Sequence, residues 1–164
     1  MDRLRQSVFS SLGGFVVEAR FVDLFAGSGA YGLEAWSRGA VGGVFVEHGR
    51  EALECLRTNL AAVAKSLRAD DRACTVSKAD ALTWAPVDGA RVALVFADPP
   101  YAMIAPNASR LFAQFDRLLL PGEAGLVVFE MPEGLVLEEP GWECFKRLGG
   151  GGPGAACACF YRRS

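Results

Sequence analysis

The sequence predicts one α/β domain, residues 1–164, built on a doubly wound, mostly parallel sheet with helices on both faces. Short apolar runs typical of buried strands alternate with segments of helical periodicity, and this alternation favours βαβ units. About half of the residues are hydrophobic (51%), so a chain of this length can bury a core without disulfides or metals. Acidic residues follow several of the apolar runs, at the sheet edge where such folds bind ligands.

Five apolar runs are predicted as the strands of this sheet, over residues 20–25, 43–47, 73–77, 92–97 and 124–130. Three helices are predicted between them, over residues 31–38, 50–67 and 107–119. In the middle helix, apolar residues recur at helical spacing and give it one apolar face: Leu53, Leu56, Leu60, Val63, Ala64 and Leu67.

Two further segments flank this pattern. Residues 2–12 have the spacing of a short amphipathic helix, within an amino-terminal segment of residues 1–14. Residues 144–148 and 156–161 are predicted as a closing hairpin around the glycine-rich residues 149–154.

The overall composition excludes several classes of protein. A net charge of −2 gives no global attraction to nucleic acid, so such binding needs local basic patches. Five cysteines without a C-x-x-C spacing argue against both a zinc site and a disulfide framework. No signal peptide and no membrane-length apolar run are found, so we expect a soluble cytoplasmic protein. Candidate basic residues lie near the two ends: Arg3, Arg5, Lys146, Arg147, Arg162 and Arg163.

A glycine-rich loop follows the first predicted strand. Phe25 leads into Ala26-Gly27-Ser28-Gly29, where the glycines let the backbone turn sharply and approach a ligand closely. The helix behind the loop supplies free N–H groups and the positive end of its dipole. The pattern Gly27-x-Gly29-x-x-Gly32 also matches the dinucleotide fingerprint, so alone it leaves open a pyrophosphate or the methionine carboxylate of S-adenosylmethionine.

Three carboxylates narrow the choice of cofactor. Asp23 lies inside the first strand, where it can receive a ligand ammonium but would repel a pyrophosphate. Glu47 ends the second strand and can accept from the ribose hydroxyls of either cofactor. Asp80, followed by Ala81, comes after the third strand and is placed to accept from an adenine amino group. Their joint occurrence favours S-adenosylmethionine.

The most informative stretch is Asp98-Pro99-Pro100-Tyr101, which directly follows the fourth strand. Two consecutive prolines end the strand and fix a rigid turn. The Asp98 carboxylate and the Pro99 carbonyl can each accept one N–H of a planar amino group, which directs the nitrogen lone pair toward a methyl donor. Tyr101 can stack on a base. These four residues are therefore predicted to be catalytic in methyl transfer to an amino nitrogen.

His48 is the sole histidine and directly follows Glu47 in a predicted turn. We count His48 among the candidate cofactor-binding residues only because it is next to Glu47. A lone histidine without a partner in sequence reach is more often an incidental surface residue, and no metal site is predicted.

The glycine loop with Asp23, Glu47 and the Asp98–Tyr101 turn together resemble class I methyltransferases of amino groups. Residues 2–9 (DRLRQSVF) and 32–40 (GLEAWSRGA) narrow the resemblance to the RsmD-like family, over almost the whole chain. That resemblance implies a Rossmann-like, seven-stranded sheet whose last strand is antiparallel. It also implies S-adenosyl-L-methionine as cofactor and transfer to the N2 amino group of a guanine in 16S ribosomal RNA. The cofactor residues implied are Asp23, Gly27, Gly29, Glu47 and Asp80.

Two departures from the family pattern concern substrate binding more than chemistry. Family members usually begin with a basic, strand-rich extension before residue 2, which is missing here, and residues 149–154 are unusually rich in glycine. We expect a monomer that acts on ribosomal RNA, either bare or within a small-subunit ribonucleoprotein particle, without a metal or a membrane.

Other functions remain open at this point. The same turn serves methylation of DNA amino groups or of protein glutamine. A noncatalytic RNA-binding protein with the methyltransferase fold is a further alternative, supported by the missing extension. A nicotinamide-dependent oxidoreductase could use the glycine loop and Glu47, but Asp23 and the lack of an acid suited to hydride transfer count against it.

Overall fold

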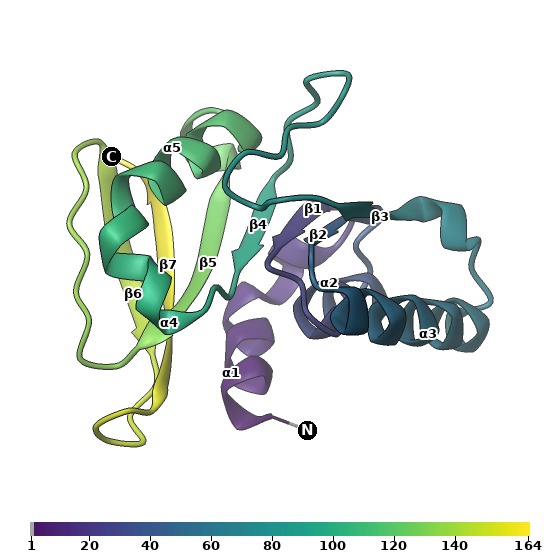
Figure 1. Cartoon of the computed structure of the whole chain (residues 1–164), viewed down its shortest axis with the longest axis horizontal. Coiled ribbons are helices and arrows are strands. Elements are labelled where there is room, and N and C mark those ends of the chain that lie inside the picture. Colours follow the sequence, from purple (N-terminus) through teal and green to yellow (C-terminus); the bar gives the residue numbers. More distant parts are fainter. Residues whose placement is uncertain (1) are drawn as a thin grey trace.

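The computed structural model describes residues 2–164 and places seven strands in one sheet, in the order β3-β2-β1-β4-β5-β7-β6 (Figure 1). The strands are β1 (Arg20–Leu24), β2 (Gly42–Glu47), β3 (Cys74–Lys78), β4 (Leu94–Ala97), β5 (Leu126–Pro132), β6 (Trp142–Leu148) and β7 (Ala156–Arg163). The helices are α1 (Arg3–Leu12), α2 (Ala30–Ser37), α3 (Arg50–Leu67), α4 (Tyr101–Ile104) and α5 (Ala108–Leu118). Four 3-10 turns are η1 (Gly13–Val16), η2 (Asp71–Ala73), η3 (Ala105–Asn107) and η4 (Gly122–Ala124).

The direction of the strands confirms the predicted doubly wound sheet. β3, β2, β1, β4 and β5 are parallel, and β7 is antiparallel to both of its neighbours, β5 and β6. The chain runs outward from β1 through β2 to β3, and then returns to place β4 on the other side of β1. The strand order reverses between β1 and β4, and ligands of such sheets bind outside the carboxyl ends of the strands at this point.

Side chains alternate between two hydrophobic cores, one on each face of the sheet. One core packs α1, α2 and α3 on the sheet through residues such as Phe9, Trp36 and Leu56. The other packs α4 and α5 through residues such as Phe112 and Phe115. Figure 1 shows α2 and α3 beside the β1–β3 half of the sheet and α4 and α5 beside the half that holds β5 to β7.

The predicted helices and strands lie close to the observed ones, with differences at their ends. β4 begins at Leu94 because Val92 forms only an isolated bridge, to Leu119. β5 begins later than predicted because the preceding residues form η4. The short helix α4 was not predicted; it begins at Tyr101, directly after the two prolines.

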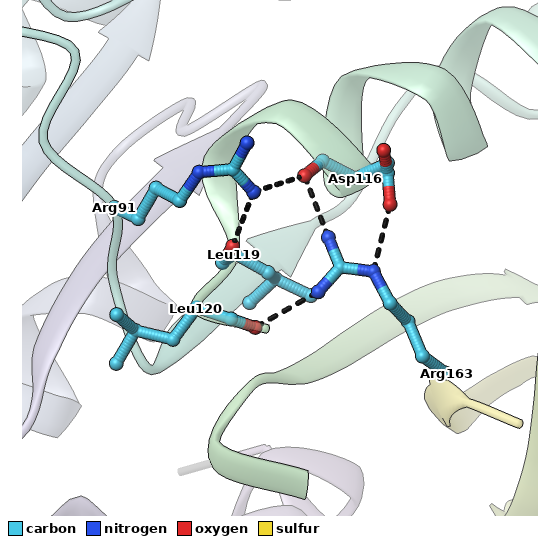
Figure 2. A network of polar contacts seen from close by, with 5 residues as sticks. All are labelled: Arg91, Asp116, Leu119, Leu120 and Arg163. Atoms are coloured by element: carbon cyan, nitrogen blue, oxygen red, sulfur yellow. Dashed lines mark hydrogen bonds and ion pairs between the residues drawn. The ribbon is translucent and has the colours of Figure 1, made fainter. Parts of the chain in front are cut away.

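Two arginines, Arg163 at the end of β7 and Arg91 in the segment before β4, donate hydrogen bonds to the carboxyl end of α5 (Figure 2). Arg163 donates from its guanidinium to the carbonyls of Asp116 and Leu120, at 2.6 and 2.9 Å, and from Nε to the Asp116 carboxylate at 2.7 Å. Arg91 donates to the carbonyls of Asp116 and Leu119, at 2.9 and 3.0 Å. The last carbonyls of a helix lack partners within it, so these donors stabilise the helix end.

Within residues 2–164, no helix combines the length and the apolar character that crossing a bilayer requires.

Candidate active site

Three of the parallel strands, β2, β4 and β5, carry an acidic residue at or near their carboxyl ends. Val46, Leu24, Ala97 and Phe129 lie in one row of the sheet register. The residues that follow this row on β2, β4 and β5 are Glu47, Asp98 and Glu130. Because side chains alternate along a strand, all three point to the face covered by α1, α2 and α3. Asp23 points to the same face from inside β1, across from Phe96.

These residues surround one cavity of about 540 Å³ at the switch point between β1 and β4. The cavity joins the glycine loop to the turn after β4. Its lining residues are Asp2, Arg5, Asp23, Phe25, Ala26, Gly27, Ser28, Ala30, Tyr31, Glu47, His48, Asp98, Pro99, Pro100, Tyr101 and Glu130. The glycine loop and the proline turn, which the sequence predicts to hold the methyl donor and the acceptor, therefore line one shared space.

The glycine loop combines tight packing with an open approach. A Cβ at Gly27 would meet nothing within 4 Å, and the backbone there is left-handed (φ 57°), so a ligand can come close to it. At Gly29 a Cβ would lie 2.3 Å from Leu56, and at Gly32 it would lie 2.4 Å from Phe45. The last two glycines thus let α2 pack on the sheet. Phe25 also has a positive φ (57°), which is strained for a residue with a side chain.

Asp23 is a buried carboxylate with one fixed partner. Its side chain is 2% exposed, and Oδ2 accepts the N–H of Gly32 at 2.9 Å, which ties β1 to α2. Burial, opposed by this hydrogen bond and reinforced by the charges of Asp98 and Glu47, raises the pKa of Asp23 well above its usual range. Among the described residues, Asp23 belongs to no ion pair. A cationic group of a ligand would stabilise its charged form.

Glu47 is held by the backbone around it. Oε1 accepts the N–H of Gly27 at 3.0 Å, and Oε2 accepts those of His48 and Gly49 at 2.8 and 3.1 Å. Burial acts to raise the pKa of Glu47, but these backbone donors outweigh it and lower the pKa. Glu47 is therefore ionised, and it orients the glycine loop as well as facing the cavity. His48 is mostly exposed, with Nδ1 3.4 Å from the Glu47 carboxylate.

The turn after β4 lines the cavity with Asp98, Pro99, Pro100 and Tyr101. The Asp98 N–H still bonds to the Leu24 carbonyl of β1, at 3.5 Å, which holds the start of the turn on the sheet. Pro99 is buried, whereas the Asp98 side chain is reached by water and the Tyr101 ring is 40% exposed. Desolvation by the cavity walls, together with the charges of Glu130 and Asp2, raises the pKa of Asp98 to about 7.

The structure adds residues that the sequence analysis did not single out for this cavity. Tyr31 of α2 donates its hydroxyl to Oε2 of Glu130 at 2.7 Å. Asp2 caps α1 by accepting the Leu4 N–H at 2.9 Å, and the Nε of Arg5 is buried without a partner among the described residues. Glu130 carried a signal in the sequence, because it is the acidic residue near the end of an apolar run, as Glu47 is.

Asp80 and Ala81 do not line this cavity. The Asp80 carboxylate accepts the N–H of Leu82 at 2.9 Å, which forms a local turn after β3. Ala81 is buried, and its carbonyl accepts from the Gln114 amide at 2.9 Å. Their predicted contact with an adenine ring therefore stays a prediction.

Comparison with known proteins agrees with this architecture. Ribosomal RNA small subunit methyltransferase D of Escherichia coli is 38% identical over 100 residues, which are 61% of this chain and 48% of that protein. The match thus spans about half the length of that curated relative. The solved structure of the candidate methyltransferase yhhF of Escherichia coli superposes with a TM-score of 0.79 at 28% identity, covering 100% of this chain and 86% of that one.

A more distant structure shows the fold alone. The RNA methyltransferase of Salinibacter ruber, solved with S-adenosyl-L-homocysteine, gives a TM-score of 0.68 at 16% identity over 99% of this chain and 91% of that one. The fold is therefore that of the Rossmann-like class I methyltransferases, as the resemblance implied. The model of one family, described as Conserved hypothetical protein 95, matches residues 1–152, and the chain belongs to that family.

Proposed function

We propose that this protein transfers a methyl group from S-adenosyl-L-methionine to the N2 amino group of a guanine in small-subunit ribosomal RNA. One observation carries the proposal: the glycine loop with Glu47 and the Asp98–Tyr101 turn line the same cavity. A methyl donor held by the first group faces an acceptor held by the second. Bringing donor and acceptor together in this way is a large part of catalysis when the cofactor already carries a good leaving group.

The residues present fit the cofactor. Asp23 supplies a buried negative charge for the ammonium of the amino acid moiety, and Gly27 leaves room for close approach. Glu47 would accept from the ribose hydroxyls, and the Gly27, His48 and Gly49 N–H groups fix its orientation. Asp80 and Ala81 remain our candidates for the adenine ring. The bound cofactor supplies an activated methyl group on its sulfonium.

The turn after β4 prepares the acceptor. An amino group conjugated to a base is a poor nucleophile, because its lone pair is delocalised into the ring. The ionised Asp98 carboxylate and the Pro99 carbonyl each accept one of its N–H bonds, which favours a pyramidal nitrogen with its lone pair aimed at the methyl group. Tyr101, half exposed at the mouth of the cavity, stacks on the base. Asp98 or water then takes the proton that the product loses.

The choice of ribosomal RNA and of guanine rests on similarity rather than on the cavity. The relative from Escherichia coli is named a ribosomal RNA small subunit methyltransferase, and the family resemblance implies guanine N2. A monomer that works in the cytoplasm, on bare RNA or on a ribonucleoprotein particle, completes the proposal.

The direct test is methyl transfer with labelled cofactor. Small ribosomal subunits and bare 16S RNA are prepared from a strain that lacks the gene, incubated with the protein, and digested to nucleosides. We expect label in N2-methylguanosine. The variant Asp98→Asn should lose at least about 100-fold in rate, because it removes an acceptor used in the transition state. Asp71→Asn, an exposed acid in η2, is the matched control and should keep the wild-type rate.

Calorimetry separates this proposal from its main alternatives. S-adenosylhomocysteine should bind to the wild type and to Asp98→Asn with similar affinity, because Asp98 acts on the acceptor. Binding of NAD without binding of S-adenosylhomocysteine would instead support the oxidoreductase. Binding of S-adenosylhomocysteine and of RNA, with no transfer to any substrate tested, would support a noncatalytic RNA-binding protein.

A further inference from the structure

Glu130, near the end of β5, places a second carboxylate beside the Asp98–Tyr101 turn. Ala97 of β4 and Phe129 of β5 are register partners, so Asp98 and Glu130, the residues that follow them, are neighbours at the carboxyl edge of the sheet. Both point to the same face and line the same cavity. Glu130 is therefore close enough to the Asp98–Tyr101 turn to contact the ring of a base whose amino group is held there.

Among residues 2–164, one carboxylate oxygen of Glu130 accepts a hydrogen bond and the other accepts none. Tyr31 donates its hydroxyl to Oε2 at 2.7 Å. The Tyr31 ring is itself fixed, because it stacks on Phe96 with a centroid distance of 5.3 Å and is 7% exposed. Within residues 2–164, Oε1 of Glu130 accepts no hydrogen bond. Within this part of the chain, Oε1 of Glu130 is thus a rigidly oriented acceptor in the cavity lining that has no hydrogen-bond partner.

The surroundings of Glu130 disfavour its charged form. Burial and the charge of Asp2 raise the pKa of Glu130, while the Tyr31 hydroxyl and the charge of Arg5 oppose this rise. The charge of Glu130 in turn helps to raise the pKa of Asp98. Glu130 is thus an acceptor in an acidic, partly desolvated cavity, where a hydrogen-bond donor from a ligand stabilises its charged form.

Guanine, adenine and cytosine differ in the ring nitrogen that lies beside the carbon bearing the amino group. In guanine, the ring nitrogen N1 beside the amino-bearing carbon carries a hydrogen and is a donor. In adenine the corresponding N1, and in cytosine N3, are acceptors. Asp98 and Pro99 accept hydrogen bonds only from the amino group. All three bases possess such a group, so the turn alone does not discriminate among them.

We propose that Glu130, oriented by Tyr31, is the residue that selects guanine, by accepting the N1–H of the base whose N2 amino group lies on the Asp98–Pro99 turn. The inference rests on the proposed function and deepens it. Guanine gains a charge-assisted hydrogen bond, whereas adenine or cytosine would bring a ring acceptor against a carboxylate oxygen. A site built around such a contact rejects the wrong partner strongly, because its polar group is then left unpaired.

The variant Glu130→Gln tests the inference with little change in shape. The Tyr31 hydroxyl can still donate to the amide oxygen, which turns the amide NH₂ toward the cavity. A donor then faces the N1–H of guanine but suits the N1 of adenine. We expect kcat/KM for guanine to fall by about 10- to 100-fold, the range for loss of a hydrogen bond to a charged group. Label in N6-methyladenosine, relative to N2-methylguanosine, should rise.

Further variants separate selection from a merely structural role. Tyr31→Phe removes the orienting hydroxyl but keeps the carboxylate, so guanine transfer should fall by about 3- to 10-fold without any gain in adenine. Glu138→Gln, an exposed glutamate after β5, is the matched control and should behave as the wild type. Affinity for S-adenosylhomocysteine and the melting temperature should be nearly unchanged in Glu130→Gln.

The outcomes distinguish the two proposals. Wild-type guanine transfer by Glu130→Gln, with an unchanged ratio of labelled bases, would overturn the inference and leave the proposed function standing. An equal loss for every base, accompanied by a lower melting temperature, would also overturn it, because Glu130 would then be structural. If the wild type labels no guanine, the proposed function fails first and the role of Glu130 fails with it.

Discussion

The raised pKa of Asp98 predicts a specific dependence of methyl transfer on pH. Desolvation, followed by the charges of Glu130 and Asp2, raises this pKa to about 7. The carboxyl is therefore protonated below pH 7, and a protonated carboxyl is a weaker acceptor for the amino hydrogen. The fraction ionised is about one-tenth at pH 6 and about nine-tenths at pH 8, so activity should rise roughly tenfold over this interval.

A substitution at Asp2 tests the cause of this shift. Asp2→Asn removes one of the negative charges that raise the pKa of Asp98, and asparagine can still cap α1 by accepting the Leu4 N–H. The pKa of Asp98 should fall, and the rise in activity should move to lower pH. Glu138→Gln, which changes an exposed charge elsewhere, should leave the profile in place.

The assay is kcat/KM for transfer between pH 5.5 and 8.5 at constant ionic strength, because this ratio reports the groups of the free protein. A flat profile between pH 6 and pH 8 would show that the ionised form of Asp98 is not needed. A shift of the Asp2→Asn profile to higher pH would refute the electrostatic reasoning itself.

Four further predictions concern the glycine loop, the base platform and the stability of the fold. Gly32→Ala would place a Cβ 2.4 Å from Phe45, so the free energy of unfolding measured in urea should fall by about 1–3 kcal/mol; an unchanged value would contradict the packing role. Gly27→Ala meets no atom within 4 Å, so it should mainly weaken S-adenosylhomocysteine binding, by roughly tenfold in calorimetry, with φ strain of about 1 kcal/mol. Tyr101→Ala should raise the KM for RNA by about 5- to 150-fold, equivalent to a stacking contact of about 1–3 kcal/mol, and an unchanged KM would exclude stacking. Arg163→Met should lower the unfolding free energy by roughly 2–3 kcal/mol through loss of donors to the end of α5, whereas a loss below about 0.5 kcal/mol would show that the contacts in Figure 2 are replaceable.

The elements with a clear hydrophobic period could be predicted from the sequence. The helix predicted over residues 50–67 is observed as α3, because its leucines mark one face unambiguously. The closing hairpin and the antiparallel last strand also agree with the structure. Element ends were less predictable, since they depend on contacts with distant segments: β7 continues to Arg163, which is anchored on α5.

The residues of the site also differ in whether the sequence predicts them. The sequence predicted the glycine loop, Glu47 and the Asp98–Tyr101 turn, because each combines a special backbone with a strand end. It did not reveal Glu130 as a site residue, because an acid near the end of an apolar run also suits a solvated surface. Only the register between β4 and β5 and the Tyr31 hydroxyl show that Glu130 faces the cavity.

A crystal structure with S-adenosylhomocysteine tests the central claim most directly. Our account predicts the ribose at Glu47, the amino acid moiety at Asp23 and Gly27, and the sulfur directed along the cavity toward the Asp98–Tyr101 turn. Binding at another surface, or a pose that directs the sulfur away from this turn, would contradict it.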